Sequence, residues 1–277
     1  MSNRLLYIYQ KERVLKVYHG AEVYESRGII LEKMIKEAAE SQEINQNYRF
    51  LINTDDSPIQ HNINGISCYS FSTITKDYDH CCPCYIFHSW PEVGIDNYSR
   101  LTDSFIDSEP ESSKVGWIGH PMSIPRKIFN AYYSNTYFSQ SLINDWNRSD
   151  PKQLHIHTKT YLTFQQQIDK WKYLIDFEGA GYSGRTKILL NSPRIVFFVD
   201  REYQEFWQKK LIPWKHYVPV KKDLSDLEEN YSKIEKDKDL QRYIKNEQKQ
   251  FCQENLLYKH AILELQRIIK ENIYVES

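Results

Sequence analysis

Alternating strand, turn and helix patterns between residues 171 and 220 constrain the fold of this chain more than any other feature. Three apolar runs there have the length and the β-branched and aromatic content of buried strands: KYLIDFEG (172–179), RIVFFVD (194–200) and HYVPV (216–220). The segments between them predict a turn followed by a helix, and then a second helix: GYSGRTKILLNS (181–192) and EYQEFWQKK (202–210). Because strand–helix–strand alternation places successive strands in parallel, this half is predicted to be an α/β layer with a parallel sheet.

The N-terminal half has a related pattern. Two short strands are predicted around the polar QKER turn within residues 4–18, followed by a helix that Ser26 caps and that extends to about residue 41. Further strands are predicted at three apolar runs: YRFLIN (48–53), GISCYSFS (65–72) and VGWIG (115–119). Residues 100–114 are rich in Ser, Asp and Glu, which predicts a loop or domain linker. Apolar residues at helical spacing predict a last helix at about 251–273.

Charge and composition exclude some classes of function. The 277 residues include 36 Lys and Arg against 37 Asp and Glu. A general nucleic-acid binder carries a basic excess, so we expect no nucleic-acid partner, and any anion site must be local. No signal-like apolar run opens the chain, and no stretch approaches the roughly 20 apolar residues of a membrane helix, so a cytoplasmic protein is expected. Five cysteines without a disulfide pattern agree with a reducing compartment.

A glycine-rich turn predicts an anion site. The strand before it ends at Asp176, and Gly179, Gly181 and Gly184 follow before a helix start. Glycines let a phosphate approach the backbone, free N–H groups at a helix start attract anions, and Arg185 offers paired donors for phosphate oxygens. The spacing matches neither the Walker loop nor the dinucleotide fingerprint. The residues alone leave an alternative open, namely a tight turn whose arginine forms a salt bridge.

Two adjacent acids, Asp55 and Asp56, follow the strand at 48–53. A carboxylate in a half-buried cleft can serve as a general base, because burial raises its pKa toward neutrality. The alternative is a solvated turn, since Asp and Ser before a proline are common turn residues. From the residues alone the turn is favoured.

The segment DHCCPC (79–84) offers one histidine and three thiols as metal ligands. Adjacent cysteines point apart, however, and no second Cys or His pair follows at ligand spacing. His61 and His88 are the only nearby additions in the sequence. Free buried thiols are therefore favoured over a structural zinc site.

A long series of residues connects these features. Between residues 171 and 227 the series consists of Gly179, Ser183, Arg185, Lys187, Pro213-Trp214, His216-Tyr217, Pro219-Val220 and Asp223-Leu224-Ser225. Its upstream part consists of Asn53, Asp56 and Pro58, and then of Gly119, Ser123 and Arg126. In this order the series resembles glycosyltransferase family 90, which includes protein O-glucosyltransferases and xylosyltransferases as well as bacterial lipopolysaccharide-core glycosyltransferases. His120, Pro121 and Met122 depart from the family pattern, which puts donor contacts from their loop in doubt.

The resemblance implies a GT-B-like α/β fold, in which two Rossmann-like domains face each other across a cleft and a C-terminal helix crosses back. The expected division is an N-terminal acceptor-side domain over 1–110, a UDP-sugar-binding domain over 111–250, and a helix over 251–277 that packs on the first domain.

The resemblance also implies roles for individual residues. Asp56 is expected to take the proton from the acceptor hydroxyl. Contacts with the UDP-sugar are expected from Gly119, Arg126, Gly179, Gly181, Tyr182, Ser183, Arg185, His216 and Tyr217. For His216 and Tyr217 a purely structural strand end is the alternative, and Asp176 and Glu178 are further candidates for contact with sugar or ribose. Because fixed positive groups can stabilise the departing UDP, neither a metal nor another cofactor is expected.

The function expected from the resemblance is inverting transfer of a hexose from a UDP-sugar to a lipopolysaccharide core or another surface glycan. A glycolipid acceptor would require transient contact with the inner face of a membrane. Two alternatives stay open: a protein O-glucosyl- or O-xylosyltransferase, and a non-catalytic glycan- or nucleotide-binding module on the same fold.

Overall fold

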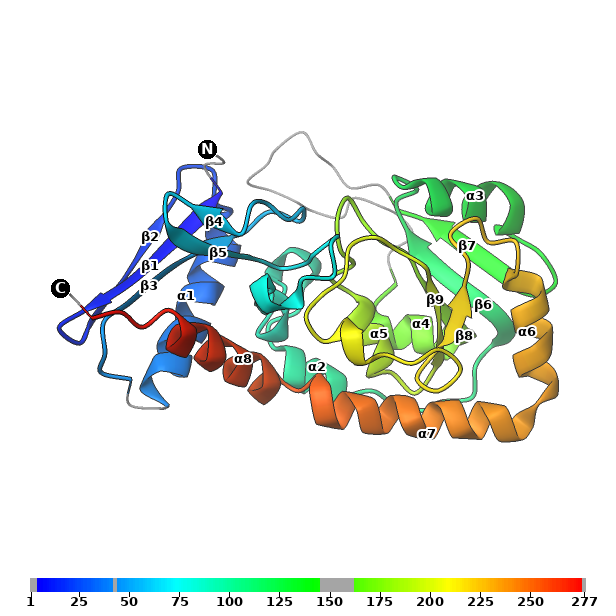
Figure 1. Cartoon of the computed structure of the whole chain (residues 1–277). Coiled ribbons are helices and arrows are strands. Elements are labelled where there is room, and N and C mark those ends of the chain that lie inside the picture. The colour runs from blue at the N-terminus through cyan, green and yellow to red at the C-terminus, as the bar shows by residue number, and fades with distance from the viewer. Residues whose placement is uncertain (1–3, 42–43, 145–161, 276–277) are drawn as a thin grey trace.

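The computed structural model describes residues 4–41, 44–144 and 162–275, which form a mixed α/β protein with two five-stranded sheets (Figure 1). The two sheets lie at opposite ends of the molecule in this view, and the two last helices run along its lower side. Within the described ranges, no helix combines the length and the apolar character needed to cross a membrane.

The first sheet has the order β2-β1-β3-β5-β4. Its strands are β1 (Leu5–Lys11), β2 (Val14–His19), β3 (Tyr48–Asn53), β4 (Asn62–Ile63) and β5 (Ile66–Ser70). The predicted hairpin is confirmed, and Glu12 and Arg13 make its tight turn with positive φ angles of 51° and 67°. The next helix crosses from β2 to β3, so that β1 lies antiparallel to both. Only β3 and β5 are parallel, and this sheet is therefore mixed and not the parallel sheet of a Rossmann-like domain.

The second sheet is parallel throughout, as predicted, with the order β10-β9-β8-β6-β7. Its strands are β6 (Ser112–Gly119), β7 (Ser139–Ile143), β8 (Trp171–Asp176), β9 (Ile195–Val199) and β10 (Val218–Val220). Every residue of β9 is buried, which agrees with its continuous apolar run, since strands of a parallel sheet are covered on both faces.

The helices cover both sheets and connect them. They are α1 (Glu25–Glu40), α2 (Tyr98–Asp103), α3 (Ile124–Tyr133), α4 (Phe164–Lys170), α5 (Thr186–Leu190), α6 (Leu227–Lys236), α7 (Lys238–Asn255) and α8 (Tyr258–Glu271). Short 3-10 turns are η1 (Tyr78–His80), η2 (Tyr85–Phe87), η3 (Pro91–Val93) and η4 (Gln208–Lys210). The last helix, α8, returns to the first half of the chain and packs on α1 and β3 (Figure 1). The Asn272 side chain donates to the Tyr69 hydroxyl at 2.7 Å, and that of Gln266 donates to Ser41 at 2.7 Å.

Two local predictions are wrong. Residues 202–210 do not form the predicted helix apart from the short turn η4, because Gln204 exchanges two backbone hydrogen bonds of 2.9 Å with Thr73 and is held extended. Ser26 does not cap α1, since the N-cap is Tyr24 and the Ser26 hydroxyl donates to a side chain of η3. The loop predicted at 100–114 is confirmed for residues 104–111, while α2 and β6 include its two ends.

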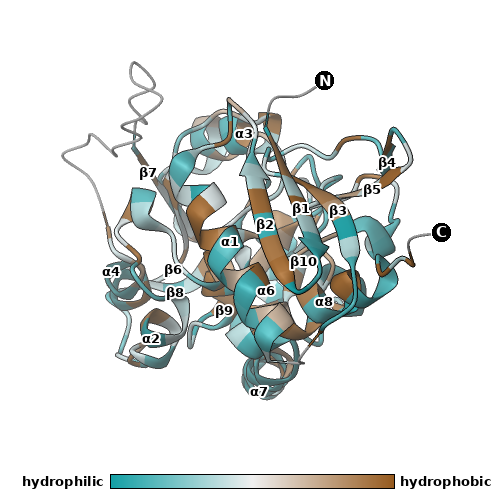
Figure 2. Cartoon of the chain, turned by 90° about the vertical axis from the view of Figure 1, so that its left-hand side faces the viewer, coloured by the Kyte–Doolittle hydropathy of each residue, from teal (hydrophilic) through white to brown (hydrophobic). Residues whose placement is uncertain are grey.

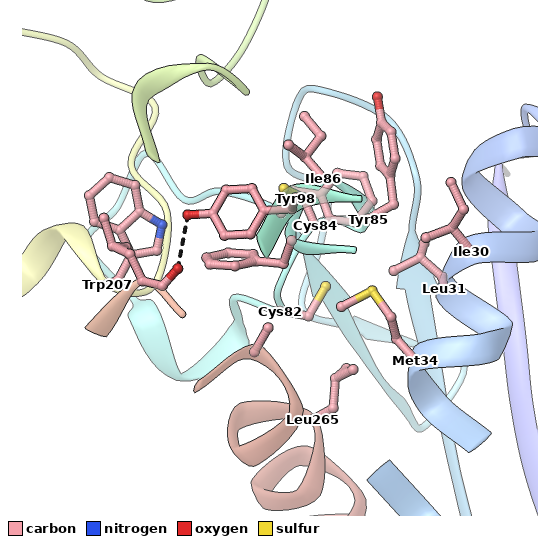
Figure 3. Close-up of a cluster of buried hydrophobic side chains, with 14 of the residues drawn as sticks. Ile30, Leu31, Met34, Cys82, Cys84, Tyr85, Ile86, Tyr98, Trp207 and Leu265 are labelled. Carbon is pink, nitrogen blue, oxygen red and sulfur yellow. Dashed lines mark hydrogen bonds between the residues drawn. The ribbon is translucent and has the colours of Figure 1, made fainter. Parts of the chain in front are cut away.

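One continuous apolar cluster includes residues from both sheets and from α8. Figure 3 shows its centre, where Met34 of α1, Leu265 of α8 and Cys82 face one another. The Tyr98 hydroxyl donates to the Leu256 carbonyl at 2.8 Å, which fixes the junction between α7 and α8. Figure 2 views the molecule from the first sheet and shows hydrophobic bands alternating with hydrophilic ones along β2, the edge strand.

Candidate functional site

A cleft of about 570 Å³ lies where the loop after β3 meets the carboxyl ends of β6 and β8. Open α/β sheets bind ligands at this edge, because the loops that follow parallel strands converge there. The cleft brings together most of the residues predicted for the site: Asp56, Gly119, Arg126, Gly179, Tyr182, Ser183 and Arg185. Its walls therefore come from both halves of the chain.

The turn after β8 is organised by Asp176, whose side chain is fully buried. This carboxylate accepts hydrogen bonds from Ser183 at 2.9 Å and from Thr186 at 2.6 Å. It also forms ion pairs with Arg185 at 3.1 Å and with Arg201 at 2.9 Å. Burial alone would raise the pKa of Asp176, but the two arginines and the hydrogen bonds lower it below its ordinary value. Asp176 is therefore ionised and holds the turn through these contacts. Its side chain does not line the cleft.

Arg185 has a structural role and still reaches the cleft. Besides its bond to Asp176, it donates to the carbonyls of Ile118 at 2.6 Å and Ile175 at 3.4 Å. The salt-bridge alternative considered for this turn is thus correct for part of the guanidinium. A guanidinium has five N–H donors, so others stay available to a ligand. The helix behind the turn, α5, has only five residues, and its dipole adds less to anion binding than the predicted helix would.

Gly181 connects the two halves of the site. A Cβ atom at this position would lie 2.1 Å from the Asp56 carbonyl oxygen, which is far inside van der Waals contact. Only glycine lets the turn after β8 approach the loop after β3 this closely. Gly179 is next to the opposite wall, where a Cβ would lie 3.9 Å from a terminal nitrogen of Arg126.

The carboxylate of Asp56 faces the cleft with its side chain 39% exposed, and it pairs with Arg27 of α1 at 3.0 Å. Arg27 also donates to the Thr54 carbonyl and lies over the rings of Tyr24 and Tyr85. Burial lowers the pKa of Arg27, but Tyr85 and Asp56 outweigh it and raise the pKa above its ordinary value. A permanent cation therefore holds the Asp56 carboxylate in place at the mouth of the cleft.

Arg126 is a cation of the cleft that has no acidic partner in the described ranges. Among the described residues, no carboxylate lies within 4 Å of its guanidinium, and its Nε atom is buried without a hydrogen-bond partner. Its two terminal nitrogens donate only long bonds of 3.3 Å to the carbonyls of His120 and Phe177. Burial, and then the nearby Arg185, lower the pKa of Arg126 to about 9. Arg126 is half-buried, and shielding a cation from water without a counter-ion is costly, so this arrangement indicates a site that an anion completes.

The local charge supports the same conclusion. Three guanidinium groups, those of Arg126, Arg185 and Arg201, influence one another around the buried carboxylate of Asp176. Glu178 lies near them but forms its ion pair with Lys222 at 3.5 Å. The edge of the second sheet is therefore positively charged although the chain as a whole is almost neutral.

The structure does not bring His216 and Tyr217 to this cleft. Both precede β10, the edge strand, which β9 separates from β8. His216 accepts the Ile212 backbone N–H at 3.1 Å and packs on Phe251, as expected of the structural alternative. Tyr217 lines a different cavity, of about 610 Å³, along β9 and β10.

Several residues of the site could not be found from the sequence. Arg27 lies in the first turn of a helix whose pattern predicted only an apolar face. Lys187 and Glu205 form a fully buried ion pair of 2.9 Å behind the turn, and Lys187 also donates to the Gly184 carbonyl at 3.1 Å. A lysine and a glutamate in apolar surroundings are a weak signal of such a pair, because surface helices contain the same residues.

The thiols of DHCCPC are free and buried, as predicted in preference to a structural zinc site. All five cysteines of the chain are free and buried. Figure 3 shows Cys82 and Cys84 among aliphatic and aromatic side chains. Burial raises the pKa of the Cys81 thiol to about 12, so it stays protonated at neutral pH.

Comparison with known proteins identifies the family. The family model for glycosyl transferase family 90 matches residues 43–265, a range that includes both Asp56 and Arg185. The chain belongs to this family.

The relatives are named as O-glucosyltransferases. Protein O-glucosyltransferase 1 of Homo sapiens is 30% identical over 217 residues, which cover 69% of this chain and 53% of the human protein. The Rattus norvegicus protein of the same name is 27% identical over 212 residues, 67% of this chain and 51% of that protein. O-glucosyltransferase rumi of Drosophila melanogaster is 48% identical over 52 residues, 19% of this chain and 13% of that protein. The chain spans about half the length of the two mammalian relatives.

Proposed function

We propose that this chain is a glycosyltransferase that moves a sugar from a UDP-sugar to a hydroxyl group of a protein acceptor. One observation carries the proposal. A single cleft has a half-buried arginine, Arg126, without a carboxylate partner among the described residues, on one wall and the exposed carboxylate of Asp56 on the other. The first suits a diphosphate, and the second suits a hydroxyl that must lose its proton.

The proposed chemistry is a single displacement. Asp56 accepts the proton of the acceptor hydroxyl while the hydroxyl oxygen attacks the anomeric carbon of the donor, and the bond from that carbon to UDP breaks. Attack on the face opposite the departing UDP inverts the configuration. Arg126 and Arg185 stabilise the negative charge that grows on the diphosphate. Because these cations supply the electrostatic stabilisation, we propose that transfer needs no divalent metal.

The proposed arrangement is of the GT-B kind, with the first sheet on the acceptor side and the second sheet on the donor side. The contact of Gly181 with Asp56 supports it, since donor turn and acceptor loop meet there. The free, buried thiols support a reducing compartment such as the cytoplasm as the place of action.

The choice of acceptor rests on the relatives. The three relatives named above are O-glucosyltransferases, two of them named for action on proteins. This supports the protein alternative of the sequence analysis over the lipopolysaccharide core, and it favours UDP-glucose as donor. A glycolipid acceptor at a membrane surface is the alternative, and the experiment compares it with protein acceptors.

The test is UDP release by the full chain from UDP-glucose, UDP-galactose and UDP-xylose, measured with a panel of folded protein acceptors and, separately, with lipopolysaccharide-core acceptors. We expect release to require a protein acceptor and to fall by about 100-fold or more in Asp56→Asn, the range expected for loss of a general base. Asp239→Asn, on the exposed side of α7, is the matched control. A wild-type chain that binds UDP yet transfers to no acceptor would support the non-catalytic alternative. Transfer to the core acceptors alone would instead support the hypothesis of a lipopolysaccharide-core or other surface-glycan acceptor.

A further inference from the structure

Two histidines and an aspartate meet at the edge of the first sheet, outside the cleft. His61 lies just before β4, while Asp77 and His80 flank the turn of η1. The Nδ1 atoms of the two histidines both point at one oxygen of Asp77, at 3.0 Å for His61 and 3.1 Å for His80. One ligand atom from each residue lies within 4.8 Å of the other two. None of the three side chains lines the cleft, so this cluster does not depend on the proposed transfer reaction.

Neighbouring groups hold the cluster in place. The imidazole rings are stacked, with centroids 4.4 Å apart and planes inclined by 12°. The ring of Tyr69 lies 5.8 Å from that of His80, and its hydroxyl accepts a hydrogen bond from Asn272 beyond α8. A ligand set whose orientation is fixed by packing loses little freedom when an ion binds.

The chemistry of this set favours a transition metal. We propose that His61, Asp77 and His80 bind a divalent ion of the zinc class. Imidazole nitrogens with a carboxylate oxygen suit Zn²⁺, Co²⁺ and Ni²⁺, whereas Ca²⁺ and Mg²⁺ require mostly oxygen ligands.

The distances fit such an ion. Bonds of 2.0–2.2 Å from zinc to nitrogen and oxygen give a tetrahedral edge of about 3.3–3.6 Å between ligand atoms. The two separations from histidine to aspartate, 3.0 and 3.1 Å, fall short of this edge by a few tenths of an ångström, and no separation in the set exceeds 4.8 Å, so side-chain rotations bring the three atoms to it. The side chains are about one-third exposed, which leaves the fourth position to water.

The charge of the cluster is also suitable. An anionic carboxylate with two imidazoles attracts a cation, and binding through Nδ1 displaces the protons that these atoms share with Asp77.

The bound ion would connect two segments of the chain. It would join the residue before β4 to η1, which leads directly into the buried thiol segment. The carbonyl of Asp79, next to His80, already accepts a hydrogen bond of 3.0 Å from Arg267 of α8. An ion at this place would therefore stabilise the packing of the first sheet against η1 and α8.

The test is a titration of the chelator-treated full chain with Zn²⁺ by calorimetry and with Co²⁺ by absorption. We expect one ion per chain, a visible cobalt spectrum of low coordination number without thiolate absorption, and a Tm that rises with Zn²⁺. His61→Gln combined with His80→Gln should weaken binding by roughly 100-fold or more and abolish the Tm rise. His19→Gln is the matched control, because His19 also forms a half-exposed pair with a carboxylate, Glu32, at 3.2 Å.

Far-UV circular dichroism checks that the double variant is folded, and Asp77→Asn gives a second, independent loss of one ligand. The proposal is overturned if the wild type takes up no Zn²⁺, if the double variant binds it as tightly as the wild type, or if cobalt shows coordination by cysteine. UDP release measured on the same samples is a separate readout, so failure of this site and failure of the proposed transfer reaction are distinguishable.

Discussion

At the scale of single residues, the charge of the site depends on the small number of carboxylates that pair with its three arginines. Asp176 is shared by Arg185 and Arg201, and it leaves Arg126 without a partner of opposite charge in the described chain. Both of these cations hold the turn to the sheet, and Arg185 also reaches the cleft. Arg126 is available to a ligand, because no carboxylate in the part of the chain that the structure describes pairs with it.

Asp176→Asn should destabilise the fold strongly. The change leaves the buried guanidinium of Arg201 and the partly exposed one of Arg185 without their counter-ion, a loss of about 3–5 kcal/mol for a broken buried pair. Because the pKa of Asp176 is lowered in the fold, its contribution is present above the unfolded pKa, near 3.9, and disappears as the pH falls through the folded pKa. Urea unfolding at a series of pH values should therefore show a large difference between wild type and variant at pH 7 that shrinks below about pH 4. A difference that is independent of pH would contradict this assignment.

Arg126→Met and Arg185→Met should both weaken UDP binding but should differ in their effect on stability. Removing Arg126 relieves a half-buried cation whose pKa is lowered to about 9, so the Tm of the ligand-free variant should stay the same or rise. Its affinity for UDP should fall by about 10- to 100-fold, the worth of a charged hydrogen bond. Arg185→Met should lower both affinity and Tm, because it also breaks the pair with Asp176. Calorimetric UDP binding and thermal unfolding test this, and unchanged UDP affinity in both variants would exclude the diphosphate site.

At the scale of secondary-structure elements, the site is a contact between two loops that each follow a buried strand. The loop after β3 carries Asp56, and the turn after β8 carries Gly181 and Arg185. Their mutual contact, together with Arg27 from α1, is what sets the distance between the proposed base and the proposed diphosphate site.

Gly181→Ala should damage activity more than binding. A Cβ atom 2.1 Å from the Asp56 carbonyl oxygen forces the two loops apart, at a cost of about 1–3 kcal/mol for overpacking. We expect kcat to fall at least tenfold while the Kd for UDP changes little, since the base moves and the arginines do not. Gly179→Ala is the graded control, because its nearest contact is 3.1 Å from the Tyr182 carbonyl oxygen. Equal effects of the two substitutions on kcat would refute the proposed positioning.

At the scale of the whole molecule, the apolar core does not stop between the sheets. The cluster that holds Leu265 of α8 and Met34 of α1 also contains residues of β8 and β9. The two halves therefore share buried surface, and we expect them to unfold together.

Leu265→Ala should test that coupling. Leu265 is fully buried, and its truncation should cost about 2–5 kcal/mol. Far-UV circular dichroism and tryptophan fluorescence should follow one coincident transition at a lower midpoint, because the buried tryptophans Trp117, Trp171 and Trp207 lie outside the first sheet and would report separately if the halves were independent. Two separated transitions in the variant or the wild type would contradict a shared core.

The parts of the fold that follow from local pattern were predicted well. The runs at 48–53 and 194–200 became β3 and β9, because a continuous apolar strand has only the interior of a sheet to occupy. The turn after β8 was recognised from its glycines and arginine. The segment at 202–210 was misread, since its helical periodicity was weaker than the backbone pairing of Gln204 with Thr73, a partner more than a hundred residues away.

By itself, the sequence determined the parallel second sheet, the family, the glycine-rich turn and the acidic loop, because each is written in a short stretch of residues. Tertiary structure alone decided which charges meet: that Arg27 holds Asp56, that Asp176 satisfies Arg185 and Arg201 but not Arg126, that His216 lies outside the cleft, and that His80 faces His61 and Asp77 instead of the thiols beside it. Electrostatic contacts depend on distances of a few ångströms between segments far apart in the chain, and no local pattern encodes those distances.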